Sequence, residues 1–126
     1  EKGWGKFHLI GNLGLRVPND TTEQSTSLHY SLHADYWFCQ WFIPFVEANG
    51  WTVLSHGDNL PLNSEGYDVF NFGSSNAGNV TQMTLGGGFR SRLMKNLDLG
   101  FAYEKAVIDP QGVTDDRFTF DVCIRF

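Results

Sequence analysis

The sequence has no long hydrophobic run. Its 126 residues contain no window of about 18 consecutive apolar residues, which excludes a transmembrane helix. Helical periodicity is scarce as well, because apolar residues rarely recur at i, i+3 and i+4. These absences do not exclude a membrane. A membrane-spanning β-strand needs only about 9–11 residues of alternating character, which leaves the mean hydropathy near neutral.

Charge and cysteine are also scarce. Charged residues make up 18% of the chain, the formal net charge is −5, and Lys and Arg form no cluster. Nucleic acid is therefore not an expected partner, since its binding depends on basic contacts to phosphate. The two cysteines, Cys39 and Cys123, have neither metal-binding nor thioredoxin spacing. A disulfide between them in an oxidising compartment and two free thiols both stay open.

Alternation of apolar and polar residues is what the sequence has in abundance. Period-2 alternation predicts β-strands with one apolar and one polar face, and it occupies 7–17, 27–36, 42–53, 82–93, 97–104 and 117–126. The third of these segments is less regular, because Ile43 and Phe45 fall on its polar parity beside Glu47 and Asn49, which we expect to point inward. A bulge, or a plug of apolar side chains at one end, would explain the exception.

The connections between these segments alternate in length. Those at 18–25, 54–79 and 109–116 are long and polar, whereas those at 37–41 and 94–96 are short. Long loops on one side and tight turns on the other are typical of outer-membrane barrels, whose short turns are periplasmic. The sequence thus predicts one domain over 1–126 with a long extracellular loop at 54–79. A β-like run from Asp68 to Phe72 extends a hairpin above the sheet or belongs to a further hairpin.

Alternation alone does not say which face meets lipid. A soluble sandwich or barrel has the same pattern, but its outer surface usually carries more Lys and Glu than this chain has after position 80. Aromatic residues gather near the expected strand ends, as at Tyr36, Trp41 and Trp51, where interfacial girdles belong. Glycines on the polar parity leave room for neighbouring charged side chains; they are Gly14, Gly86, Gly88 and Gly100. We therefore expect the apolar parity to face lipid.

The last ten residues, RFTFDVCIRF, carry a resemblance to a known class of protein. The segment resembles the outer-membrane β-signal, a terminal aromatic residue preceded by apolar or aromatic residues at alternating positions. The matching residues are Phe118, Phe120, Val122, Ile124 and Phe126. The wider pattern is similar to the porin-like and transporter-like barrel superfamily. The resemblance implies the bacterial outer membrane as location, and as partners its lipid and lipopolysaccharide and the barrel-assembly machinery. It identifies a class and not a function.

The number of strands is too small for a closed barrel. Six membrane-length strands are visible, whereas the smallest outer-membrane barrels have about eight. An open sheet in lipid would leave two edges of unpaired backbone groups. We expect an antiparallel transmembrane β-barrel that is completed by a longer chain or by association with other chains, as a homo-oligomer or a larger membrane assembly. The absence of a signal peptide and the abrupt start at Glu1 favour a mature or trimmed chain.

Charged residues on the polar parity form the candidate site. The turn at 94–96 sets Leu93 opposite Leu97 and Arg92 opposite Asp98, and the 109–116 loop brings Asp98 near Arg125. The predicted lumen cluster comprises Arg90, Arg92, Asp98, Glu104, Asp121 and Arg125. It is either a constriction that selects permeant solutes by charge or a structural ion network that packs a narrow lumen.

Other polar residues give no sign of catalysis or metal binding. His29 and His33 share a strand face but lie about 13 Å apart, too far for one metal ion. Ser31, His33 and Asp35 form a row with steps of about 7 Å, which is too long for a catalytic triad. No enzyme, catalytic residue, metal or cofactor is therefore expected. We expect passive transport of small solutes by a porin-like channel. The first alternative is an anchoring barrel with a packed lumen and no transport, and the less favoured one is an outer-membrane enzyme.

Overall fold

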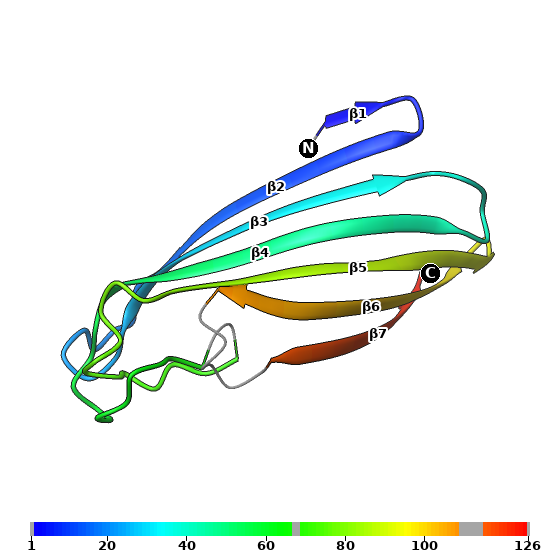
Figure 1. Ribbon diagram of the computed structural model, residues 1–126. Coiled ribbons are helices and arrows are strands. Elements are labelled where there is room, and N and C mark those ends of the chain that lie inside the picture. The colour runs from blue at the N-terminus through cyan, green and yellow to red at the C-terminus, as the bar shows by residue number, and fades with distance from the viewer. Residues whose placement is uncertain (1, 67–68, 109–114, 126) are drawn as a thin grey trace.

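The described part of the chain is one antiparallel β-sheet. The computed structural model describes residues 2–66, 69–108 and 115–125, and this part contains seven strands and no helix. The all-β prediction is confirmed. Figure 1 shows the strands side by side in a single curved layer, in the same order as in the chain. They are β1 (Lys2–Trp4), β2 (Phe7–Arg16), β3 (Thr26–Tyr36), β4 (Ile43–Ser55), β5 (Thr81–Met94), β6 (Leu97–Ile108) and β7 (Asp116–Ile124).

Strand β1 is the element that the alternation pattern did not reveal. Its three residues are too short to display a period, and they fold back on β2 through a turn in which Gly5 has a φ of 63°. Glycine adopts this left-handed conformation without steric cost. Lys2 then pairs with Leu9, which places β1 at one edge of the sheet and raises the strand count from six to seven among the described residues.

Short turns lie at one end of the sheet and long connections at the other. Figure 1 shows the β1–β2, β3–β4 and β5–β6 turns together at what we call the turn end. The connections after β2, β4 and β6 leave from the opposite end, which we call the loop end. The connections after β2 and β4 are longer than the turns after β1, β3 and β5, as expected, and most of the predicted 109–116 loop lies outside the described residues. Among the described residues no helix has the length and apolar character needed to cross a bilayer.

The long connection between β4 and β5 adds no strand in its described residues. Asp68 lies outside the described part of the chain, and the neighbouring residues contribute an isolated bridge between Gly66 and Phe70. The connection is fastened by Glu65, whose buried carboxylate accepts hydrogen bonds from the Ser25 hydroxyl and from the backbone N–H of Ser74 at 2.7 Å. This contact ties it to the connection between β2 and β3.

The two faces of the sheet differ in polarity and exposure. We call the face with the charged residues the inner face and the opposite face the outer face. In β4, Ile43, Phe45 and Trp51 are buried on the inner face, whereas Val46 on the outer face is 63% exposed. Pairing of β4 with β5 runs without irregularity through Ile43 and Phe45. The apolar exceptions in this segment are therefore a plug at the turn end, and not a bulge.

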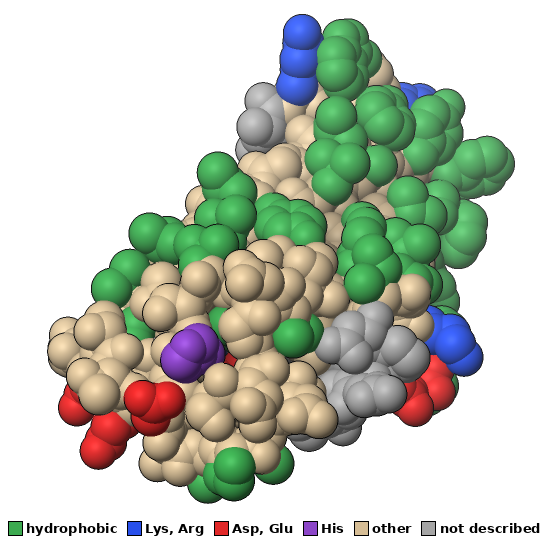
Figure 2. All heavy atoms as spheres, turned by 60° about the vertical axis from the view of Figure 1, so that its left-hand side comes forward, with side chains coloured by type: hydrophobic (Ala, Val, Ile, Leu, Met, Phe, Trp, Pro, Cys, Tyr) green, Lys and Arg blue, Asp and Glu red, His purple; other side chains and the backbone are tan. Residues whose placement is uncertain are grey.

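The outer face is covered with exposed apolar side chains. In β7 the exposed fractions are 64% for Phe118, 77% for Phe120 and 65% for Val122. Figure 2 shows hydrophobic side chains gathered over the strands, while the loop end in the foreground is mostly polar with a few acidic residues. Charged side chains such as Asp98 and Glu104 are buried on the inner face, whereas apolar side chains are exposed on the outer face, which is the reverse of what a solvated sheet surface requires.

The sheet is open. Strands β1 and β7 are its two edges and do not pair with each other within the described residues. Each edge presents backbone N–H and C=O groups that need partners if the surroundings exclude water.

Candidate functional site: the polar inner face

Antiparallel register places the charged side chains of the inner face opposite one another. Arg92 pairs with Asp98 across the β5–β6 turn, as predicted. The expected pairing of Leu93 with Leu97 is wrong, because an irregularity in the turn sets Met94 opposite Leu97. Such an extra residue locally disrupts the ladder and increases the twist of the strand.

Asp98 is the centre of the first ion-pair group. Asp98 is 5% exposed, and its Oδ1 lies 3.3 Å from Nε of Arg92, while Arg125 donates to its other oxygen. The Arg92 guanidinium also lies 5.1 Å from the centre of the Trp37 ring. The structure therefore brings together Arg92, Asp98 and Arg125 at the turn end, with an aromatic side chain beside them.

Arg90 and Asp121 form a looser pair on the same face. Nη2 of Arg90 is 3.9 Å from Oδ2 of Asp121, and both side chains are nearly half exposed. Gly100 faces Asp121, and a Cβ at position 100 would overlap the carboxylate. The expectation that inner-face glycines leave room for charged neighbours holds here, and also at Gly86, where a Cβ would overlap the Glu104 side chain.

Glu104 lies in a separate group nearer the loop end. Its carboxylate is nearly fully buried and accepts hydrogen bonds from Nδ2 of Asn49 at 2.6 Å, from the Thr84 hydroxyl at 3.3 Å and from Nε of Arg117. The predicted cluster is thus divided among separate contacts. Sequence reasoning missed Arg117 as the partner of Glu104, although both belong to the polar parity and they pair directly in the β6–β7 register.

Contacts between histidines and carboxylates continue the polar network across β2, β3 and β4. Nδ1 of His8 is 2.8 Å from Oδ1 of Asp35, and the two residues are register partners. Nδ1 of His33 lies 3.5 Å from Oε2 of Glu47, and the centre of the His33 ring is 4.9 Å from that of the Phe45 ring. Within the described residues, no group of three or more His, Cys, Asp or Glu side chains is arranged to hold a metal ion. Cys39 and Cys123 are both free.

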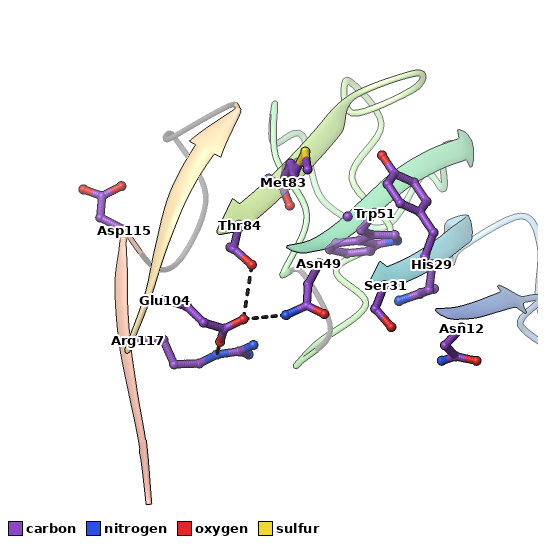
Figure 3. Close-up of a pocket in the computed structure, with 13 residues that line it drawn as sticks. Asn12, His29, Ser31, Asn49, Trp51, Met83, Thr84, Glu104, Asp115 and Arg117 are labelled. Atoms are coloured by element: carbon purple, nitrogen blue, oxygen red, sulfur yellow. Dashed lines mark hydrogen bonds and ion pairs between the residues drawn. The ribbon is translucent and has the colours of Figure 1, made fainter. Parts of the chain in front are cut away.

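Two cavities divide the inner face. A loop-end cavity of about 280 Å³ is lined by residues from β2 to β7, and Figure 3 shows its side chains, with Glu104 joined to Asn49, Thr84 and Arg117. A turn-end cavity of about 210 Å³ lies among His33, Arg90 and Asp98. Ile43 and Phe45 line the turn-end cavity and are themselves buried.

The residues of the predicted C-terminal signal share the outer face. Phe118, Phe120, Val122 and Ile124 are all exposed there, in the edge strand β7. Phe126 lies outside the described residues. The alternation of the final segment thus places its apolar side chains on the same face as those of the other strands.

Comparison of the chain with models of protein families, with curated proteins and with solved structures finds no match.

Proposed function

We propose that this chain forms part of the wall of an outer-membrane β-barrel, with its outer face toward lipid and its inner face toward a lumen. The observation that carries the proposal is the inverted polarity of the sheet. Phe120 is 77% exposed on one face, whereas Asp98 and Glu104 are buried and paired on the other. The exposed apolar face is compatible with lipid hydrocarbon, and the charged face is compatible with a polar lumen.

The arrangement of the connections supports the same proposal. Short turns at one end and long polar connections at the other are the pattern of bacterial outer-membrane barrels. Closure requires partners for β1 and β7, since unpaired backbone groups in lipid cost several kcal/mol each. Further strands of a longer chain or other copies of this chain would supply those partners.

We further propose that the barrel is a porin-like channel for the passive transport of small solutes. Two cavities on the inner face and partly exposed charges such as Arg90 and Asp121 support a wet lumen. The second candidate is an anchoring barrel with a packed lumen. The buried Ile43 and Phe45, which fill space at the turn end, favour that candidate.

Two measurements test the proposal at its two levels. A gel-mobility shift between heated and unheated protein tests the barrel, because a closed barrel in detergent migrates differently until it is unfolded. Single-channel recording in planar bilayers then tests transport. Conductance steps support the channel, and a silent bilayer that holds the inserted barrel supports the anchoring alternative. A protein that shows no mobility shift and does not enter bilayers contradicts the membrane proposal altogether.

A further inference from the structure

Neutral polar side chains form a continuous row across four strands in the loop-end cavity. Asn12 pairs with Ser31, Ser31 with Asn49, and Asn49 with Thr84, so neighbouring strands present their polar groups at the same level. Adjacent strands are about 4.8 Å apart, which sets the spacing of the row. Figure 3 shows Asn49, Ser31 and Asn12 along the same side of the cavity.

A second row runs beside the first and ends in an unsatisfied amide. His29 pairs with Trp51, and Trp51 pairs with Gln82. The His29 and Trp51 rings stack with their centres 5.4 Å apart. Gln82 is 3% exposed, and neither its Nε2 nor its Oε1 has a hydrogen-bond partner among the described residues. A buried amide without partners is costly, so its presence in a cavity wall calls for a ligand that satisfies it.

We propose that the loop-end cavity binds a neutral, polyhydroxylated solute of about monosaccharide size. The inference deepens the proposed transport function and rests on it, because it names the class of solute that this part of the lumen recognises. A hydroxyl group both donates and accepts, which is what the two free atoms of the Gln82 amide require. The first row adds the neutral side chains of Asn12 and Ser31, and the half-buried His29 ring, which stacks on Trp51, gives an aromatic surface that suits the C–H face of a sugar ring.

Charge and size restrict the ligand further. The negative charge of Glu104 is balanced by Arg117, while Asp115, an exposed residue of the lining, leaves the cavity with an excess of negative charge. An anionic solute is therefore disfavoured. The volume of about 280 Å³ lies just below the range of about 300–1,000 Å³ for drug-sized ligands, so the cavity suits a single sugar ring.

Calorimetric titration of the full chain in detergent micelles with D-glucose and with D-glucuronate tests this inference. We expect saturable binding of glucose and binding of glucuronate that is at least about tenfold weaker. Equal binding of the two sugars would overturn the assignment to a neutral ligand. Absence of saturable glucose binding to folded protein would overturn the site itself.

A substitution at position 82 separates recognition from folding. Gln82→Met keeps the length of the side chain and removes the unpaired amide, so glucose affinity falls about tenfold or more while the urea midpoint of unfolding stays constant or rises. The matched control is Gln24→Met in the β2–β3 connection, which leaves both quantities unchanged. A lower midpoint for Gln82→Met would show that the amide has a structural partner, and unchanged affinity would show that it does not contact the sugar.

A second variant keeps the test independent of position 82. Ser31→Ala removes a hydroxyl from the cavity lining, so the affinity falls several-fold without loss of folded protein. Unchanged affinity in this variant also counts against the site. Conductance distinguishes this inference from the function on which it rests. Channels that conduct but do not bind glucose overturn the sugar site alone, and glucose binding without conductance overturns the transport proposal alone.

Discussion

The ring of Tyr30 covers Gly50 on the outer face of the sheet. The two residues are register partners on β3 and β4, and the nearest atoms to a Cβ built at position 50 all belong to the Tyr30 ring. An aromatic side chain that fills the space above a cross-strand glycine shields the backbone there and fixes the register of the pair.

Gly50→Ala is expected to destabilise the protein because its methyl group would displace the Tyr30 ring. Overpacking of this kind costs about 1–3 kcal/mol. Urea unfolding followed by tryptophan fluorescence measures the loss. In a double-mutant cycle, Gly50→Ala should destabilise a chain that also carries Tyr30→Ala by less than it destabilises the parent protein. Gly11→Ala is the matched control, since the nearest atom to its Cβ is 4.0 Å away. Equal effects at Gly50 and Gly11 would contradict the contact.

Leu32→Arg and Ser31→Arg place the same charge on opposite faces of β3. Leu32 is 50% exposed on the outer face, and Ser31 lines the inner cavity. In lipid the outer-face arginine costs about 2–4 kcal/mol near the midplane, while the inner-face arginine meets a polar lumen. Insertion into lipid vesicles, measured by protease protection, should fall for Leu32→Arg only. If both variants insert like the parent protein, the outer face does not meet hydrocarbon.

Glu104→Ala removes the acceptor shared by Asn49, Thr84 and Arg117. Because Arg117 can reach water, the main penalty comes from the donors that lose their partner, and we expect a loss of about 1–3 kcal/mol in the free energy of unfolding. Lys105→Met breaks the exposed ion pair with Asp116, in which Nζ of Lys105 is 3.9 Å from Oδ1 of Asp116. This substitution should lower the free energy of unfolding by about 0–1 kcal/mol. Chemical denaturation of the two variants checks the order, and a reversed order would show that Glu104 is not a structural anchor.

Thiol labelling of whole bacterial cells tests which end of the sheet faces outward. Asn76→Cys, in a chain in which Cys39 and Cys123 are serine, places a thiol at an exposed position of the loop end. A membrane-impermeant maleimide should label it in intact cells. Cys39 in the β3–β4 turn, kept as the single thiol, should react only after the outer membrane is permeabilised. Labelling of Cys39 alone in intact cells would reverse the proposed orientation.

Arg90→Ala should shift ion selectivity toward cations if the inner face lines a channel. The substitution removes a partly exposed positive charge and leaves Asp121, whose carboxylate lies 3.9 Å from Nη2 of Arg90. Fixed charges of this kind determine which ions a pore favours. The reversal potential in a salt gradient measures the shift, and Arg90→Lys should restore the parental value. Conducting channels with the same reversal potential in all three proteins would place Arg90 outside the permeation path.

The strands and faces were accessible from sequence because side-chain alternation is a local property. The parity of Asp98 and Glu104 follows from their own segment, and the tight β5–β6 turn gives the pairing of Arg92 with Asp98. Pairings across long connections are harder to infer, because loop length does not determine register. Asp98 is predicted to lie near Arg125 across the 109–116 connection, but that prediction does not extend the same β6–β7 register to the contact between Glu104 and Arg117.

Contacts made by the long connections were less accessible still. Glu65 lies outside the segments of alternating apolar and polar residues, so no sequence pattern indicates its burial. In the structure it is fully buried between two connections. Gln82 reads as an ordinary polar residue of an alternating strand, and its buried, unpartnered amide is visible only once β4 and β5 are paired. Three-dimensional neighbours, rather than residue type, distinguish both side chains.

Among the described residues, each strand of this sheet has its chain neighbours as its spatial neighbours. A hairpin is therefore a self-contained part of the sheet. Adding or duplicating one would enlarge the circumference of a barrel by two strands without rethreading the remainder of the chain. Pore diameter in such an architecture can change by whole hairpins, while the polar and apolar faces of every existing strand keep their assignments.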